Sequence, residues 1–193
     1  MDNFDIASAF TFRPDVEGWY VVDHAGPTNY GVTQTTLDNY LRKTGSKERL
    51  SVKDMGSDMA YTIARDMYYD SVGLGNLPAK VGVAAFDYGY NSGPTQAIKD
   101  LQRVVGVKDD GIYGNKTHGA VVEYVAQNGE DALVGEYIGR RRELMRRLVE
   151  KNPEKYGQYA NGWENRLNNL SEYLTAVGGV TGADGSVGVA VGQ

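Results

Sequence analysis

Apolar residues recur every three or four positions along most of this chain, which is the spacing of an amphipathic helix. A first helix should run to about residue 12, because Phe4, Ala7 and Phe10 would share one side of it and Pro14 would interrupt it. The helical spacing returns after Gln34. The predicted helices there are one capped by Thr35 and ended by Gly45, a helical region from Ser51, and helices at residues 78–88, 94–105, 116–127, 131–151 and 162–177.

Two short β-prone pieces, residues 19–22 and 30–33, are the exception to this pattern. The polar segment between them includes Gly26 and Pro27, which are turn-forming residues. We therefore predict a small β-hairpin in which residues 23–29 connect the two strands. The fold class that follows is mainly α, a helical bundle with a small β-hairpin beside it.

The length of 193 residues allows one or two compact domains. Turn-forming residues at 91–94 and a loss of apolar periodicity from residue 178 divide the chain. We predict a first region at residues 1–90, a helical region at 91–177 and a Gly-rich tail at 178–193. Because the first region has few helices with which to bury a core, we expect the first two regions to pack as one unit.

The composition narrows the classes of function that are open to this chain. It contains no Cys, which excludes a disulfide scaffold, a thiolate zinc site and a cysteine nucleophile. Its formal net charge of −5 argues against a nucleic-acid partner, since general nucleic-acid binders are usually basic. The 25 Gly and 14 Tyr indicate many turns and amphipathic aromatic surfaces, as in a cleft that holds a polymer.

Neither a membrane span nor a secretory signal is expected. No apolar run approaches the ~18–20 residues that cross a bilayer. The first five residues include two Asp and lack an apolar core segment. We therefore expect a protein that is made in the cytoplasm without a signal peptide and that needs another route if it acts outside.

Glu17 is the main candidate for acid chemistry. It follows the break at Pro14 and adjoins Trp19 and Tyr20, and a carboxyl group against aromatic rings is poorly solvated when charged. Such surroundings favour the protonated form that a general acid needs, and Gly18 leaves room for a substrate beside it. Without further context, a surface position at the end of a helix is the simpler interpretation of Glu17.

A second carboxylate and a polar cluster follow Glu17 in the predicted hairpin. Asp23 lies in the connection, and residues 28–34 read Thr-Asn-Tyr-Gly-Val-Thr-Gln. Two carboxyl groups on either side of a sugar can act as acid and base, or as acid and nucleophile, in glycoside hydrolysis. The arrangement therefore favours a glycosidase with the hairpin as one lip of its cleft.

The order and spacing of these motifs resemble those of the glycoside hydrolase family 108 lysozymes, the muramidases typical of phage endolysins. The resemblance in the first half is carried by Glu17-Gly18-Trp19-Tyr20, then Asp23, then residues 28–34. The second half is similar to the peptidoglycan-binding module that follows in this family. Its matching motifs are Phe86-Asp87, Asn91-Ser92-Gly93-Pro94, Leu101-Gln102, Gly106-Val107, Asp110-Gly111-Ile112-Tyr113-Gly114, Thr117, Gly162-Trp163 and Asn165-Arg166.

The resemblance implies a lysozyme-like α+β fold and places the family's catalytic Glu on Glu17 and its loop Asp on Asp23. A Thr hydroxyl of residues 28–33 could hold the attacking water instead of Asp23. Trp19 stands where the family signature has Gly, so it adds a face for sugar stacking or partly closes the site. The expected substrate contacts are Trp19, Tyr20, Thr28, Asn29, Tyr30, Thr33, Gln34 and Asn91, and no metal or organic cofactor is implied.

Three groups of residues have two interpretations each. The polar side chains of residues 29–34 bind the N-acetyl groups of a sugar or hydrogen-bond within the hairpin. The helix face at residues 86–91 lines the cleft opposite Glu17 or packs in the core. The arginine-rich segment at 140–147 attracts anionic wall polymers or, as we favour, is a solvated helix face paired with glutamates of the same helix.

The function expected from the resemblance is cleavage of the bond between N-acetylmuramic acid and N-acetylglucosamine in peptidoglycan. Such a protein would be made in the bacterial cytoplasm and act on the cell wall for a phage or prophage, or be carried in the virion. Its partners would be glycan strands and, through the tail, other virion proteins. The alternatives are a virion-associated wall-binding or structural protein with secondary or lost catalysis, and a lytic transglycosylase, which uses one acid and no water.

Overall fold

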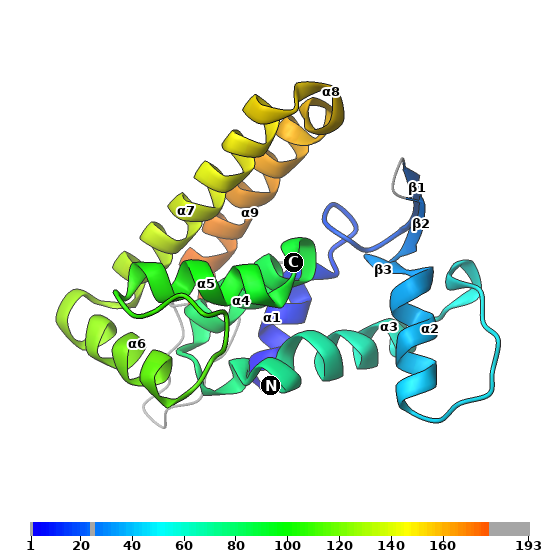
Figure 1. The fold of residues 1–193 in the computed structure, drawn as a ribbon, viewed down its shortest axis with the longest axis horizontal. Coiled ribbons are helices and arrows are strands. Elements are labelled where there is room, and N and C mark those ends of the chain that lie inside the picture. The colour runs from blue at the N-terminus through cyan, green and yellow to red at the C-terminus, as the bar shows by residue number, and fades with distance from the viewer. Residues whose placement is uncertain (1, 24–25, 178–193) are drawn as a thin grey trace.

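The computed structural model describes residues 2–23 and 26–177 and confirms the mainly α fold with a small antiparallel sheet (Figure 1). The predicted tail at 178–193 lies outside the described residues. The strands and helices are α1 (Asn3–Thr11), β1 (Tyr20–Asp23), β2 (Gly26–Asn29), β3 (Val32–Thr33), α2 (Gln34–Lys43), α3 (Ser57–Ala64), α4 (Ala79–Ser92), α5 (Pro94–Val104), α6 (Asn115–Asn128), α7 (Glu130–Lys151), α8 (Pro153–Tyr156) and α9 (Ala160–Val177). Short 3-10 or π-helical turns lie at Val52–Asp54, Arg65–Tyr69, Asp70–Val72, Leu74–Asn76 and Gly157–Tyr159.

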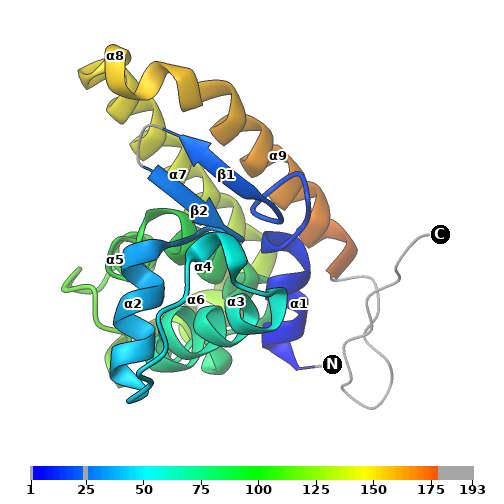
Figure 2. The same ribbon diagram turned by 90° about the vertical axis from the view of Figure 1, so that its right-hand side faces the viewer.

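Helix α4 is the centre of the fold because it is apolar almost all round. Every residue from Val81 to Gly89 is buried, which distinguishes a core helix from a surface helix with a single apolar face. Helices α1, α5, α7 and α9 pack around it. Figure 2 shows α1 beside α9, where the rings of Phe10 and Tyr173 lie 5.4 Å apart. The first and last helices of the described chain therefore meet at the same core.

Helices α7 and α9 lie side by side and form an arm on one side of the molecule (Figure 1). The favoured interpretation of the arginine-rich segment is confirmed for Arg146, which pairs with Glu143 and Glu150 on the exposed surface. It is wrong for Arg141, whose side chain is only 1% exposed. Within the described residues, neither these nor the other helices have an apolar stretch long enough to span a bilayer.

The sheet differs from the predicted hairpin in the partner of β1. That partner is β2, which lies inside the segment expected to be the connection. The N–H of Tyr30 donates to the carbonyl of Trp19 at 3.3 Å, and hydrogen-bonded pairs alternate with unbonded pairs along an antiparallel ladder. Pro27, opposite Val22, therefore falls on a pair that needs no N–H. This register explains how a turn-forming residue lies within a strand.

A two-residue turn at Tyr30 and Gly31 joins β2 to β3, and both residues have positive φ, 50° and 74°. The turn places Thr33 immediately before α2, where its hydroxyl accepts a hydrogen bond from the N–H of Thr36 at 3.1 Å. The prediction of Thr35 as the cap of α2 is therefore wrong, because the cap is Thr33.

Helix α4 extends beyond its predicted end at residue 88. Asn91 and Ser92 complete its last turn, and Gly93, with φ of 88°, ends the helix. Pro94 then begins α5 at a position where a missing N–H costs no hydrogen bond. The break predicted at residues 91–94 is thus narrower than expected, and Asn91 belongs to a helix.

The main hydrophobic cluster draws side chains from both predicted regions. Phe4 and Phe86 of the first region lie in it with Leu101, Tyr137 and Leu170 of the second. A second cluster lies under the sheet between α2 and α3. The residues before and after position 90 therefore share one core, while the boundary itself stays a prediction.

Candidate active site

Glu17 lies in a tight loop between α1 and β1. The carbonyl oxygen of Arg13 accepts hydrogen bonds from three successive N–H groups, those of residues 16–18, at 2.9, 3.2 and 3.0 Å. This closure brings the backbone of Gly18 so near to Pro14 that an added Cβ would lie 2.8 Å from Pro14 Cα. The loop itself therefore needs glycine at position 18, in addition to any room that a substrate needs.

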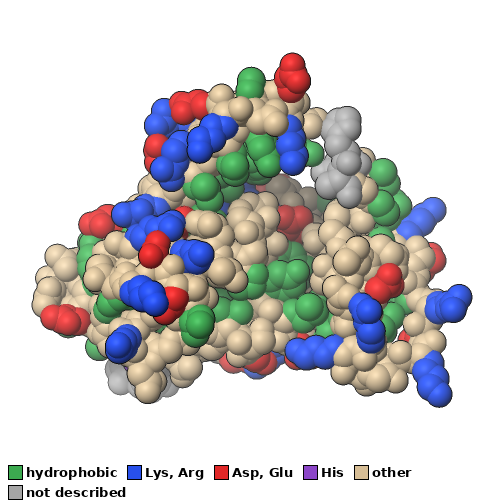
Figure 3. Space-filling view, in the orientation of Figure 1, with side chains coloured by type: hydrophobic (Ala, Val, Ile, Leu, Met, Phe, Trp, Pro, Cys, Tyr) green, Lys and Arg blue, Asp and Glu red, His purple; other side chains and the backbone are tan. Residues whose placement is uncertain are grey.

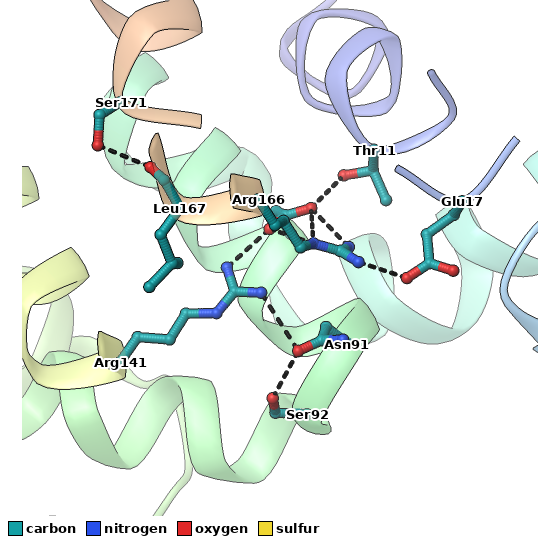
Figure 4. A network of polar contacts seen from close by, with 9 residues as sticks. Thr11, Glu17, Asn91, Ser92, Arg141, Arg166, Leu167 and Ser171 are labelled. Atoms are coloured by element: carbon teal, nitrogen blue, oxygen red, sulfur yellow. Dashed lines mark hydrogen bonds and ion pairs between the residues drawn. The ribbon is translucent and has the colours of Figure 1, made fainter. Parts of the chain in front are cut away.

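Arg166 of α9 contacts the carboxyl group of Glu17. Its Nη1 donates a hydrogen bond to Glu17 Oε1 (Figure 4). The side chain of Glu17 is 21% exposed and that of Arg166 is 9% exposed. The pair therefore lies at the edge of the core, where a ligand can reach the carboxyl group but the guanidinium group is held inside.

Asp87 of α4 holds Arg166 in place. Its carboxylate is fully buried and accepts hydrogen bonds from Nη2 and Nε of Arg166, at 2.8 and 3.1 Å. It also accepts from Nη1 of Arg141 at 2.7 Å and from Oγ1 of Thr11 at 3.1 Å. One buried carboxylate thus ties α1, α4, α7 and α9 together beside Glu17. We call Asp87, Arg141 and Arg166 the buried charge cluster, of which Figure 4 labels the two arginines.

The two arginines keep Asp87 ionised. Burial by itself would raise the pKa of Asp87, but the charges of Arg166 and Arg141 outweigh burial and lower this pKa from 3.8 to about 2. With a folded-state pKa below the unfolded value, the native protein binds this proton less readily than the unfolded chain. The contribution of Asp87 to the free energy of unfolding is therefore complete above about pH 4 and is lost as the pH falls toward about 2.

This acid dependence is testable by urea unfolding. Between about pH 6 and about pH 3, we expect the wild-type protein to lose about 1 kcal/mol more of its free energy of unfolding than Asp87→Asn does, because the variant has no proton to bind there. Both proteins share every other carboxylate, so the difference between them isolates Asp87. The same pH dependence in the two proteins would contradict the prediction.

The other side of Glu17 is formed by Tyr90 of α4 and by the turn that joins β2 to β3. The hydroxyl of Tyr90 donates to the carbonyl of Tyr30 at 2.7 Å. A Cβ added to Gly31 would lie 2.7 Å from Tyr90 Cε1 and 3.0 Å from Glu17 Oε2. Burial, and next the charge of Glu17, raise the pKa of Tyr90 well above its usual value, so Tyr90 stays a neutral donor. The turn backbone therefore lies close against the carboxyl group.

The residues that follow Glu17 form an exposed apolar lip along β1. Trp19, Tyr20, Val21 and Val22 are 63, 40, 50 and 65% exposed. The molecular surface is hollowed between the side of the hairpin and the α7–α9 arm (Figure 3). Amphipathic aromatic side chains at such a rim are suited to contact with sugar rings. Substrate contacts at Trp19 and Tyr20 stay predictions that this exposure supports.

Three other predicted contacts take part in the fold. Asn29 is 7% exposed, and its amide donates to the carbonyl of Val52 at 3.0 Å. The side-chain oxygen of Gln34 accepts from the N–H of Val52 at 2.7 Å, and the hydroxyl of Thr33 caps α2. Asn29 and Gln34 thus fasten the sheet to the segment after α2, beyond the hairpin itself. Contact of these three side chains with a substrate stays a prediction.

Asp23 and Thr28 are placed along the hairpin. Asp23 is the last residue of β1, and its backbone pairs with Gly26 at the far end of the strand from Glu17. At roughly 3.3 Å per residue, β1 extends about 10 Å from Tyr20 to Asp23. Thr28 lies in the middle of the sheet, paired with strands on both sides. The role of Asp23 as second carboxylate stays a prediction.

The buried charge cluster was not predicted as a unit. In the sequence, Asp87 lies on a predicted helix face with two interpretations, Arg141 in the arginine-rich segment and Arg166 in a motif of the C-terminal resemblance. The predicted contact Asn91 adjoins the cluster, since its Oδ1 accepts from Arg141 Nη2 at 3.4 Å. The signal for the cluster in the sequence is an Asp within an otherwise apolar helix. A carboxylate on such a helix is buried, and a buried carboxylate needs cationic partners. The described residues contain no group of three or more His, Asp or Glu that could hold a metal ion.

Known families and structures resemble this chain over most of its length. Residues 12–93 match the family Glycosyl hydrolase 108, and residues 96–168 match the Predicted Peptidoglycan domain. Curated proteins gave no match. The structure of Brucella abortus SagA is similar to this chain with a TM-score of 0.76 and 31% sequence identity, over 92% of this chain and 97% of that chain.

The two matched segments meet at the site. Glu17 and Asp87 lie in the first segment, and Arg141 and Arg166 lie in the second. The order of the motifs, the fold and the likeness to a solved structure thus agree, and the predicted resemblance is confirmed. The chain belongs to glycosyl hydrolase family 108 and carries a C-terminal predicted peptidoglycan domain.

Proposed function

We propose that this glycosyl hydrolase is a muramidase that hydrolyses the bond between N-acetylmuramic acid and N-acetylglucosamine in peptidoglycan. The observation that carries the proposal is the placement of Glu17, a partly exposed carboxyl group held beside the apolar lip of β1. The matched peptidoglycan domain supports the polymer, and the matched glycosyl hydrolase family supports the class of reaction.

Glu17 is the group that protonates the glycosidic oxygen as the bond to the leaving sugar breaks. The transition state resembles an oxocarbenium ion, and either a carboxylate or a water molecule meets the opposite face of the sugar. Asp23 is the candidate for that carboxylate, and the hydroxyl of Thr28 or Thr33 is the candidate that holds the water. Attack by a carboxylate would retain the configuration at the sugar carbon, and direct attack by water would invert it.

A lytic transglycosylase is the second candidate function. Arg166 contacts two carboxylates, and only Glu17 of these two is partly exposed. Asp87 is fully buried, and both of its oxygens accept from arginines. A transglycosylase needs one acid and no water, since the muramic acid's own hydroxyl closes an anhydro ring. The single reachable carboxyl group of this pair fits that chemistry as well.

The end groups of digested peptidoglycan distinguish these functions. The purified protein is incubated with purified peptidoglycan, and the soluble products are identified by mass spectrometry. We expect fragments with reducing N-acetylmuramic acid ends. Anhydro-muramyl ends would identify a transglycosylase, and reducing N-acetylglucosamine ends would move the cleavage to the other bond. Binding to peptidoglycan without soluble products would favour the wall-binding alternative.

For the biological role, we propose degradation of the bacterial cell wall by a phage or prophage. The absence of Cys fits a protein made in a reducing cytoplasm and used elsewhere. The test is expression in a bacterial cytoplasm with and without a pore-forming phage protein. Lysis only with the pore supports an endolysin, and detection of the protein in purified virions supports a particle-borne enzyme.

Gly31→Ala tests whether the hairpin turn positions Glu17. The added Cβ would press against Tyr90 and Glu17 at a φ of 74°, whereas Gly45, with φ of 75°, has no atom within 4 Å of an added Cβ. Gly45→Ala therefore carries the same backbone strain without the contact. We expect peptidoglycan cleavage by Gly31→Ala to be at least about tenfold slower than by Gly45→Ala, since displacement of a reacting group is costly. Equal rates would show that the turn does not position the carboxyl group.

A further inference from the structure

The arginine that contacts Glu17 comes from the segment matched to the peptidoglycan domain. Arg166 follows Glu17 by 149 residues in the chain, and the match to the glycosyl hydrolase family ends at residue 93. The matched name of the second segment describes a wall polymer, whereas its Arg166 lies against the carboxyl group of the first. This placement indicates a role in catalysis for the second segment.

We propose that Arg166 is a positioning residue for Glu17, which fixes one oxygen of the carboxyl group and so sets the direction in which the other oxygen faces a substrate. The C-terminal segment then completes the catalytic centre in addition to any binding of the wall. This inference rests on the proposed role of Glu17 as the general acid.

The first argument is geometric. A guanidinium group is planar and rigid, and Nε and Nη2 of Arg166 bind Asp87 at 3.1 and 2.8 Å. Asp87 is itself held by Arg141 and Thr11. Arg166 cannot turn without losing its bonds to Asp87, so its Nη1 is a fixed donor aimed at Glu17 Oε1.

The fixed contact gives the two oxygens of Glu17 different roles. Oε1 is held by Arg166, while Oε2 lies toward Gly31, 3.0 Å from where a Cβ would be. Because residue 31 has no side chain, Oε2 has more room than it would beside any other residue. The anchored oxygen therefore sets the direction of the carboxyl group, and Oε2 is the oxygen that delivers the proton.

The second argument is the balance of charge. Asp87 carries one negative charge against the two positive charges of Arg141 and Arg166, and these side chains are 0, 1 and 9% exposed. The cluster therefore carries a net positive charge at the edge of the core, and the carboxyl group of Glu17 lies against it. This charge, in addition to the hydrogen bond, holds the carboxyl group beside Arg166.

The other charged and titratable groups around Glu17 are bound elsewhere or stay neutral in the part of the chain that is described. Arg13 of the same loop pairs with Asp15 on the exposed surface. Arg141 of α7 is bound to Asp87. Tyr90 of α4 is neutral, because burial and then the charge of Glu17 raise its pKa. Arg166 is thus the cation that holds the carboxyl group of Glu17.

The test is the rate of peptidoglycan cleavage by Arg166→Gln and Arg166→Lys, with kcat and KM measured separately. Arg166→Gln removes the fixed donor, so its kcat should fall between about tenfold and a hundredfold as the orientation is lost, while KM stays close to the wild-type value. Arg166→Lys keeps the charge but lacks the planar fork that binds Asp87 and Glu17 together, so its kcat should fall as well.

Arg142→Gln is the matched control. Arg142 also joins α7 to α9, through Glu164 at 2.9 Å, but it is 41% exposed. The same substitution there should leave both kcat and KM unchanged. A folded Arg166→Gln with the wild-type kcat, or one whose loss lies in KM alone, would overturn the proposal, because a loss of orientation at the carboxyl group slows the chemical step.

The outcome is decisive even if one variant does not fold. Thermal unfolding shows whether Arg166→Gln is native, and if it is not, Arg166→Lys alone decides. A wild-type kcat in the folded lysine variant would overturn the proposal. Failure of the proposed function is a separate result, since Glu17→Gln would then keep its activity whatever the Arg166 variants do.

Discussion

Replacement of Glu17 by glutamine is expected to slow peptidoglycan cleavage by between about 10²- and 10⁴-fold, which is the usual contribution of general acid catalysis. Glutamine keeps the shape of the side chain and an oxygen that can accept a hydrogen bond from Arg166 Nη1. It has no proton to give to a leaving sugar. The substitution therefore removes the acid and little else, and the fall in turbidity of a peptidoglycan suspension measures the rate.

The control for this experiment lies in the same loop. Asp15→Asn removes the same charge two residues earlier, from a side chain that is 48% exposed and pairs with Arg13. We expect the wild-type rate from it. Because Glu17→Gln leaves Arg166 with one carboxylate instead of two, thermal unfolding must show that the variant is folded. A folded Glu17→Gln with the activity of Asp15→Asn would refute Glu17 as the acid.

Glu17 is a candidate already at the level of the sequence because its signals are local. A helix break at Pro14, a glycine and two aromatic residues lie within six positions of one another. The long helices were predicted for the same reason, since apolar residues recur at helical spacing within each of these segments. The helix expected at 131–151 is α7, Glu130–Lys151, and the one expected at 116–127 is α6.

Strand β2 was missed because its residues are typical of turns. Gly26 and Pro27 have poor strand propensity, and their place in the sheet depends on register. Pro27 is tolerated because it lies opposite Val22 on a pair that needs no N–H. Pairing of this kind is a property of two segments together, so no single window of sequence reports it.

The buried charge cluster was missed because it joins residues that are far apart in the chain. Asp87 meets Arg141 and Arg166 across 54 and 79 residues. Arg141 stands in a run of arginines whose other members, such as Arg146, are exposed. Sequence spacing shows that one helix carries many arginines, but only the packing of α7 on α4 decides which of them is buried.

The cluster also explains why the two matched segments fold around one site. A buried carboxylate needs cationic partners, since an unpaired buried charge is costly. Arg166 bonds both oxygens of Asp87 through Nη2 and Nε, Arg141 adds a further hydrogen bond, and Nη1 of Arg166 is left for Glu17. The same contacts therefore hold α7 and α9 against α4 and place a donor at the carboxyl group of Glu17.

Asp87→Ala is expected to be the most destabilising single change in the site. Removal of one partner of a buried ion pair costs about 3–5 kcal/mol of the free energy of unfolding. Here the change leaves Arg141 without a carboxylate, Arg166 with Glu17 alone, and Thr11 without its acceptor. We therefore expect a loss at the upper end of that range, measured by urea unfolding at neutral pH.

The matched control is Asp109→Ala, which also removes an arginine's carboxylate. Asp109 accepts from Arg103 at 2.7 Å, but it is 44% exposed, so water replaces the lost partner. An exposed pair of this kind contributes at most about 1 kcal/mol. The contrast should extend to catalysis, because Asp87→Ala releases Arg166 from the position that fixes Glu17 and Asp109→Ala does not. If the two variants lose similar free energies of unfolding, the cluster does not hold the four helices together, and the orientation of Glu17 must have another source.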